Sequence, residues 1–273
     1  DISGCIAITG NGLSPVLMSM ERLKYLNLWN CMSLDSSSLS SFSQRGYVEG
    51  LVELSLRGCH GIDDGVFSHI AHLENLQRLD LRSCELITGN TIGLLWSDTK
   101  KLNRLHSLNM KCCFGLTDLR GIARLQSLQN LNLGECWQLT SSALQHLSPL
   151  ENILRLDLSG CRNIINPLYS GIPGLSSMSR MTTLYLSNCE RLGAHSLASL
   201  VSLHSLQVLD ISGCSHIPPS DVKYLWGLKK LKRVNASHCS WSGCSALRYV
   251  APIESIEELI LSACSNLVGT SLV

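Results

Sequence analysis

The chain has 273 residues, of which 45% are hydrophobic and 16% charged, and its formal net charge is +1. This apolar, charge-poor composition excludes a disordered chain, and the near-zero charge provides no overall attraction to nucleic acid or an anionic membrane. No run reaches the roughly 18 apolar residues that a membrane span needs. We therefore expect a folded protein that binds no nucleic acid and spans no membrane.

One motif, Leu-x-x-Leu-x-Leu-x-x-Cys with a hydrophobic residue three places further on, recurs along the whole chain. Its cysteine returns every 23 to 29 residues, at Cys31, Cys59, Cys84, Cys113, Cys136, Cys161, Cys189, Cys214, Cys239 and Cys264. Such self-similarity indicates a supersecondary unit stacked on itself. We therefore predict a single domain over residues 1–273, of about eleven repeats.

Both ends of the chain fall inside a repeat. The five residues Asp1–Cys5 are identical to Asp210–Cys214, which makes Cys5 an eleventh member of the cysteine series. At the other end, Leu272 follows Cys264 at the spacing that separates repeat residues elsewhere. Neither end shows the polar cap that terminal repeats need. We expect the domain to be truncated within a repeat at both ends.

The repeat that starts at Leu128 shows the predicted elements clearly. Leu131 and Leu133 alternate with polar residues, which predicts a strand with one buried face. Apolar residues three apart over Ser141–Leu147, after a Thr140 suited to N-capping, predict a short helix. Each helix returns the chain to the same edge, so the strands are parallel and about 4.8 Å apart. The predicted fold class is an α/β solenoid (horseshoe), with a parallel β-sheet on its concave face and short helices on its convex face.

This pattern resembles the leucine-rich repeat, and its cysteine resembles the cysteine-containing variety. That variety has Cys where other subclasses have Asn, then Ile or Leu and often Thr-Asp, as in residues Cys113–Asp118. Because such repeats are best known from F-box proteins, the resemblance implies the substrate-recognition part of a ubiquitin-ligase adaptor. A cullin ligase core would bind through an N-terminal region outside this segment. The alternative is a structural scaffold subunit of a large cytoskeletal or ciliary assembly; an immune-type receptor or a secreted effector is less favoured.

The thirteen cysteines are best explained by packing. Eleven occupy one inward position, where free cysteine behaves as a small hydrophobe. Neighbouring thiols would be hazardous under oxidising conditions, so we expect an intracellular protein, cytoplasmic or nuclear. The two remaining cysteines, Cys112 and Cys244, lack the ligand spacing of a zinc site. Cys112 is the better candidate for a reactive thiol, although ordinary exposure explains it as well.

No motif of catalysis or cofactor binding is present. The sequence lacks a phosphate loop, a nucleophile elbow and a His-Glu-x-x-His pattern. His69 and His72 lie three residues apart on one predicted helix, without a third ligand to complete a metal site. We therefore predict no enzymatic activity, no cofactor and no metal.

Two rows of outward-facing residues on the predicted sheet help to distinguish residues that the fold requires from residues that could serve binding. The residue between the two strand leucines is mostly Asp or Asn, which fits either a ligand-facing stripe or a requirement of the repeat. Two residues further on, large and basic side chains in the first half give way to Gly and Ser. The predicted partner-binding residues are Tyr25, Trp29, Arg57, Arg78, Arg82 and Lys111. They suit an acidic or phosphorylated segment, unless Asp80 and Glu135 neutralise them within a solvated network.

Three further expectations concern local irregularities. The longer cysteine intervals predict loops at residues 40–50, 96–103 and 169–179. Trp241 is expected to turn inward and fill the volume left by Val234 and Ala236, which replace leucines. The basic cluster at residues 229–233 is either a solvated edge or a nuclear-import patch.

Overall fold

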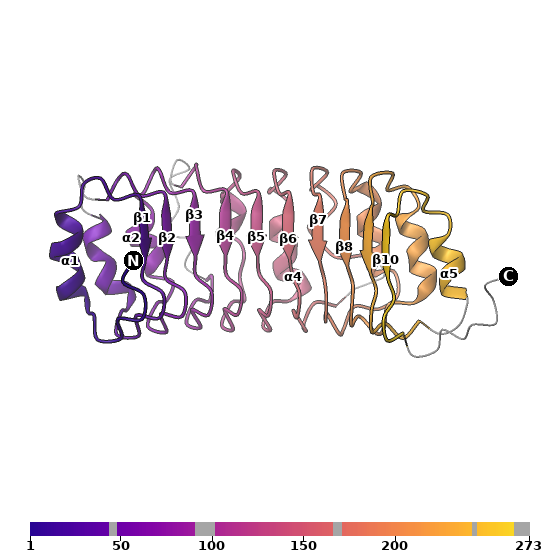
Figure 1. Cartoon of the computed structure of the whole chain (residues 1–273), viewed down its shortest axis with the longest axis horizontal. Coiled ribbons are helices and arrows are strands. Elements are labelled where there is room, and N and C mark those ends of the chain that lie inside the picture. Colours follow the sequence, from indigo (N-terminus) through magenta and orange to yellow (C-terminus); the bar gives the residue numbers. More distant parts are fainter. Residues whose placement is uncertain (44–47, 91–101, 166–170, 242–244, 265–273) are drawn as a thin grey trace. The chain divides into compact units, whose positions relative to one another are not determined.

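A computed structural model describes residues 1–43, 48–90, 102–165, 171–241 and 245–264. The chain divides into two compact units, Asp1–Gln138 (unit 1) and Leu139–Val273 (unit 2). The same strand-and-helix repeat builds both units (Figure 1). No helix among the described residues is long and apolar enough to cross a membrane. The division of residues 1–273 into one truncated repeat domain stays a prediction.

Each unit contains a parallel sheet of three-residue strands. Unit 1 has β1 (Tyr25–Asn27), β2 (Glu53–Ser55), β3 (Arg78–Asp80), β4 (Ser107–Asn109) and β5 (Asn130–Asn132). Unit 2 has β6 (Arg155–Asp157), β7 (Thr183–Tyr185), β8 (Val208–Asp210), β9 (Arg233–Asn235) and β10 (Glu258–Ile260). Equivalent leucines pair across neighbouring strands, as Leu26 does with Leu54 and Leu54 with Leu79. This register keeps every central side chain on the core face.

Short helices lie on the side opposite to the strands (Figure 1). In unit 1 they are α1 (Gly10–Met18), η1 (Ser36–Ser43), α2 (Val66–Ile70) and η2 (Ile122–Arg124), where η denotes a 3₁₀ helix. In unit 2 they are α4 (Ser141–Leu144), η3 (Gln145–Leu147), η5 (Ser196–Ser202), η6 (Pro219–Leu225) and α5 (Ser245–Val250). Buried helix residues such as Leu39 and Phe67 complete the core beneath the strand leucines.

The structure refines the predicted helices and loops. The helix predicted over Ser141–Leu147 is present, but it changes from α4 to η3 at Gln145. Thr140 is its N-cap residue, yet the Thr140 hydroxyl bonds Ser142 at 2.8 Å instead of capping the backbone. The loop predicted from residue 40 is wrong at its start, because residues 40–43 continue η1. Residues 48–50, 102–103 and 171–179 of the predicted loops form neither helix nor strand, as expected. Residues 44–47, 96–101 and 169–170 of these loops lie outside the described residues.

Ten cysteines form the cysteine ladder: Cys31, Cys59, Cys84, Cys113, Cys136, Cys161, Cys189, Cys214, Cys239 and Cys264. All ten are buried, as predicted. Within each unit, ladder thiols also donate hydrogen bonds to the backbone carbonyl that follows the strand of the preceding repeat, as from Cys59 to Leu28 at 3.1 Å and from Cys214 to Leu186 at 3.0 Å. The prediction that Cys5 is buried with them is wrong, because the Cys5 side chain is exposed.

The residue before each ladder cysteine adopts a left-handed backbone conformation. In all ten repeats of the ladder, from Asn30 to Ala263, the φ angle of this residue lies between +55° and +73°. Glycine enters this region without steric cost, and Asn enters it more readily than most residues. The turn that brings each cysteine inward therefore depends on a conformation that the sequence motif does not reveal.

Polar side chains also tie neighbouring repeats together at the turn that follows the cysteine. The buried Asp64 carboxylate accepts hydrogen bonds from the backbone N–H groups of Thr88 and Gly89, at 2.9 and 3.0 Å. The Thr88 hydroxyl donates to the same carboxylate at 2.7 Å. The acidic and threonine residues of the repeat tail are thus partners across one repeat boundary.

Trp241 points inward, as predicted. Its side chain is 1% exposed, and its indole N–H donates to the Ile217 carbonyl at 2.9 Å. Val234 and Ala236 are buried in the same repeat. The large indole thus occupies a part of the core where smaller side chains replace leucine. Residue 242 lies outside the described residues.

Candidate protein-binding surface on the strand face

Unit 1 brings the predicted partner-binding residues together on the outward side of its strands. Residues Trp29, Arg57, Arg82 and Lys111 form what we call the cation row. Backbone hydrogen bonds place its members side by side: Asn30 donates to the Arg57 carbonyl, Gly58 to that of Arg82, and Ser83 to that of Lys111, at 2.7, 2.8 and 2.9 Å. The other two predicted residues, Tyr25 and Arg78, are the first residues of β1 and β3, whereas the cation row follows the last residues of the strands.

Trp29 and Arg57 contact each other directly. The Arg57 guanidinium carbon lies 5.1 Å from the centre of the Trp29 ring, within the range of a cation–π interaction. The indole remains 46% exposed. The pair therefore presents an aromatic surface and a positive charge to solvent in one fixed arrangement.

Two of the predicted cations are already paired with carboxylates. Arg82 forms a bidentate contact with Asp80, with Nε to Oδ1 at 3.0 Å and Nη2 to Oδ2 at 2.6 Å. Arg78 pairs with Glu53 on the adjacent strand. The alternative interpretation, a neutralising network, thus holds for Asp80 and Arg82. It does not hold for Lys111, which forms no ion pair within the described residues.

Glu135 has a different partner from the one expected. Its carboxylate accepts a hydrogen bond from the Trp137 indole N–H at 3.0 Å. Trp137 in turn stacks on Phe114, with ring centres 4.4 Å apart. Glu135 is therefore oriented by an aromatic pair beside the cation row.

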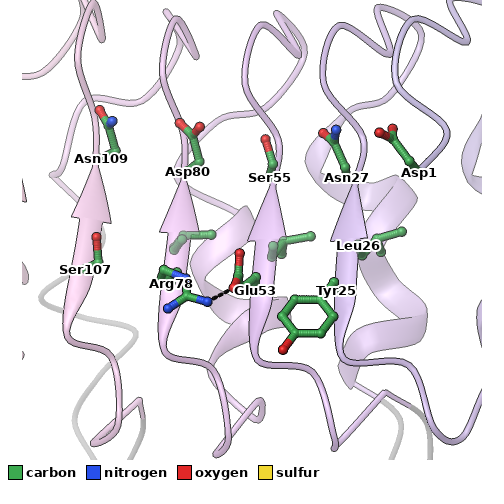
Figure 2. Close-up of a pocket in the computed structure, with 12 residues that line it drawn as sticks. Asp1, Tyr25, Leu26, Asn27, Glu53, Ser55, Arg78, Asp80, Ser107 and Asn109 are labelled. Atoms are coloured by element: carbon green, nitrogen blue, oxygen red, sulfur yellow. Dashed lines mark ion pairs between the residues drawn. The ribbon is translucent and has the colours of Figure 1, made fainter.

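A groove of about 530 Å³ runs over β1 to β4 (Figure 2). One wall is the row Tyr25, Glu53, Arg78 and Ser107, and the other is the row Asn27, Ser55, Asp80 and Asn109, which we call the polar row. Leucines of the strands form its floor. Figure 2 shows the Arg78–Glu53 ion pair projecting from neighbouring strands, with Tyr25 beside it.

The recurring Asp or Asn at the polar-row position has a structural role in most repeats, although Ser55, Tyr185 and Ile260 take its place in three of them. The side-chain oxygen accepts a hydrogen bond from the backbone N–H two residues later, closing a turn at the end of the strand. The bond measures 3.1 Å in Asn27–Trp29 and Asn109–Lys111, and 2.8 Å in Asp210–Ser212. The same contact occurs at Asp1, Asp80, Asn132, Asp157 and Asn235. The alternative interpretation, a stripe kept only for a ligand, is therefore unnecessary.

The electrostatic surroundings of Cys112 do not activate its thiol. Burial raises the pKa of Cys112, and the nearby Glu135 carboxylate adds to that effect. Lys111, Arg57 and Arg82 act in the opposite direction but do not outweigh burial. Cys112 is half-buried. Ordinary partial exposure thus explains Cys112, whereas Cys244 lies outside the described residues.

The remaining candidate sites resolve into local contacts. His69 lies in α2 and its Nδ1 bonds the Ser43 hydroxyl at 3.0 Å, whereas His72 lies beyond the end of that helix. The described residues contain no group of three or more His, Cys, Asp or Glu side chains that could hold a metal ion. In the basic cluster, Lys232 pairs with Glu257 at 2.7 Å and Arg233 with Glu258 at 3.2 Å.

Glu53 is the surface residue that sequence reasoning missed. It stands between Tyr25 and Arg78 in the strand register. Alignment of the repeats places all three residues at the same position, so the sequence contained the signal. The pairing changes Arg78 from a free cation into half of a neutral pair.

The fold defines the class of protein: this chain is a leucine-rich-repeat solenoid. It resembles an internalin C2 of Listeria monocytogenes, with 22% identity and a TM-score of 0.57 over 83% of this chain and 84% of that one. It also resembles an internalin, inlF, of the same species, with 17% identity and a TM-score of 0.54 over 89% and 68% of the two chains. This likeness shows the fold alone.

Three curated proteins have similar sequences. A "Putative adenylate cyclase regulatory protein" of Trypanosoma equiperdum is 29% identical over 70% of this chain and 31% of its own length. "Protein SUPPRESSOR OF npr1-1, CONSTITUTIVE 1" of Arabidopsis thaliana is 28% identical over 65% and 12%. "Antagonist of mitotic exit network protein 1" of Eremothecium gossypii is 25% identical over 64% and 45%. The matched segment thus spans less than half of each relative. No family model matches the chain.

Proposed function

We propose that this chain is a non-catalytic, protein-binding segment of a longer protein, and that its partner binds the strand face of unit 1. The observation that best supports this proposal is the cation row. At the equivalent position, later repeats have small residues such as Gly134, Ser159 and Ser212, so the fold itself does not need large side chains there. Large exposed residues that the fold does not require are expected to serve recognition.

The chemistry of the row supports a protein partner. Trp and Arg dominate the energetics of protein interfaces because each combines a large contact area with directional interactions. The stacking of Arg57 on Trp29 fixes both side chains before binding. Less side-chain entropy is then lost when a partner docks.

The finer form of the proposal is substrate recognition within an F-box-type ubiquitin-ligase adaptor. The resemblance to cysteine-containing repeats supports it, and the column of free buried thiols suits a reducing compartment, the cytoplasm or nucleus. A cullin ligase core would bind a region outside residues 1–273. The relatives' names, which include a regulatory protein and an antagonist, are compatible with a regulatory role.

The test compares two matched double variants of the full-length protein. Trp29→Ala with Arg57→Ala removes the cation–π pair of unit 1. Arg155→Ala with Tyr185→Ala removes another cation–π pair, in unit 2, whose guanidinium carbon lies 4.7 Å from the ring centre. Truncation of one hot-spot residue typically costs about 2 kcal/mol or more of binding free energy. We expect the first variant to lose at least about tenfold in recovery of a co-purifying protein, and the second to retain it.

The outcomes separate the alternatives. Recovery of a cullin and its F-box-binding linker subunit supports the adaptor, whereas stoichiometric recovery within a stable assembly supports a scaffold subunit instead. Equal recovery of every co-purifying protein by both variants would contradict binding through unit 1. Circular dichroism and thermal unfolding of both variants control for loss of structure.

A further inference from the structure

The available positive charges of the cation row are separated from one another. Within the part of the chain that the structure describes, neither Arg57, which lies over the Trp29 ring, nor Lys111 forms an ion pair with a carboxylate. Arg82 lies between them and is neutralised by Asp80. A partner therefore meets two single positive charges that flank a neutral pair.

The polar row beside these charges offers unused hydrogen-bond donors. The side-chain oxygens of Asn27 and Asn109 are occupied by their own turns. No hydrogen bond of the described residues uses the two side-chain NH₂ groups or the Ser55 hydroxyl. An extended peptide leaves its carbonyl groups free to accept from such donors, whereas a helix bonds most of its carbonyl groups internally.

The distance between Arg57 and Lys111 determines how far apart two negative charges of a partner must lie to pair with both. Arg57 and Lys111 belong to repeats two strands apart, so their positions are separated by about 10 Å at about 4.8 Å per strand. A polyproline II segment rises about 3.1 Å per residue with three residues per turn. Its residues i and i+3 therefore lie on the same side, about 9 Å apart.

We propose that unit 1 binds an extended acidic segment of a protein in which two carboxylates are three residues apart. This inference rests on the proposed function and names the chemistry of its partner. The segment crosses β2 to β4 with its backbone along the polar row. One carboxylate pairs with Arg57 and the other with Lys111.

The same geometry favours carboxylates over a phosphate group. A phosphate carries close to two negative charges, and it is recognised best by converging, bidentate arginines. Arg82, the central arginine of the row, already uses two guanidinium nitrogens to bind Asp80. Two separated single charges match two separated carboxylates.

The experiment uses fluorescein-labelled synthetic peptides with blocked ends and an uncharged Ala, Pro and Ser background. Each carries two glutamates separated by two, three, four or seven positions, and two control peptides carry one glutamate or one phosphoserine. Fluorescence anisotropy with the whole protein measures their affinities. We expect the three-position peptide to bind at least about fivefold more tightly than the single-glutamate peptide, with a loss of affinity at higher salt.

Variants assign the two contacts. Arg57→Ala and Lys111→Ala should each reduce the three-position peptide to the affinity of the single-glutamate peptide. Arg155→Ala, a stacked arginine of unit 2, should leave the affinity unchanged. Because none of the three residues is buried in the core, thermal unfolding should stay close to that of the parent protein.

Several results would overturn the inference. They are equal affinity at every spacing, tightest binding at seven positions as for a helical partner, tighter binding of the phosphoserine peptide, or no binding of any probe. If no probe binds while the double variant at Trp29 and Arg57 still loses its co-purifying protein, the inference fails and the proposed function stands.

Discussion

Each ladder cysteine combines two properties at the scale of one residue. Its small side chain fills the bend after the strand, and its thiol donates to a carbonyl of the preceding repeat, as from Cys84 to Leu56 at 3.2 Å. Burial raises the pKa of Cys59 to about 11 and that of Cys84 further still. The neutral, hydrogen-bond-donating thiol is therefore the form that the fold stabilises.

Thiol alkylation should separate the cysteines by their surroundings. In native protein at pH 8, we expect iodoacetamide to modify the half-buried Cys112 at least about a hundredfold faster than Cys84 or Cys113, since only an accessible thiolate reacts readily. Peptide mass spectrometry measures each site, and denaturant should equalise the rates. Uniform labelling of native protein would contradict the burial of the ladder.

The same shifts set a limit on alkaline stability. A thiol with an unfolded pKa near 9 and a raised folded pKa contributes its stability fully below about pH 9. That contribution is lost as the pH rises toward the folded value, about 11 for Cys59. The ladder therefore destabilises the fold in alkali rather than in acid.

At the scale of an element, the 3₁₀ helix η1 depends on the residue before it. Its sequence is rich in serine, a weak helix former. The Asp35 carboxylate accepts the Ser38 N–H at 2.8 Å and the Ser37 hydroxyl at 2.7 Å. Hydrogen bonds from Ser37 and Ser38 lower the pKa of Asp35. Asp35 thus acts as the cap of η1.

Removal of this cap should destabilise unit 1. We expect Asp35→Ala to lower the free energy of unfolding by about 1 kcal/mol in urea at pH 7. Asp35→Asn, which keeps a hydrogen-bond acceptor, should lose less. Because the folded pKa of Asp35 is lowered, its contribution is present above about pH 4 and disappears as the pH falls through the folded value. An unchanged unfolding curve for Asp35→Ala would exclude the capping role.

The repeating sequence pattern predicts the strands and their register. It does not predict backbone turns or side-chain rotamers inside a repeat. The alternation of Leu131 and Leu133 with polar residues identifies the strand, and register follows from the repeat, so the neighbours of the cation row were predictable. The sequence did not predict the left-handed turn because residues as different as Gly58, Ser83 and His238 occupy it. The stacking of Arg57 on Trp29 depends on side-chain rotamers, which no sequence pattern specifies.

At the scale of the whole molecule, each stacked repeat makes contact chiefly with the repeats next to it. In such arrays stability is approximately a sum of repeat and nearest-neighbour contributions. Leu79 of β3 is 2% exposed and pairs with Leu54 and Leu108 on the flanking strands. A defect at Leu79 should therefore act locally.

Hydrogen exchange tests this locality. Leu79→Ala should cost about 2 to 5 kcal/mol of local stability, with faster amide exchange in β2, β3 and β4 and little change in β7 to β9. Leu209→Ala in β8, fully buried, should give the converse pattern. Equal acceleration along the chain in both variants would instead show that the repeats unfold as one cooperative unit.

The turn at the end of each strand has an evolutionary consequence. Asn27 and Asp80 close the same turn with the same side-chain oxygen, so exchange of one residue type for the other preserves the hydrogen bond. Such an exchange nevertheless alters the local charge by one unit. A lineage can therefore revise what this surface attracts by single substitutions that preserve the turn, except at Asp80, whose carboxylate also binds Arg82. Deamidation of an ageing asparagine would make the same change within one molecule's lifetime.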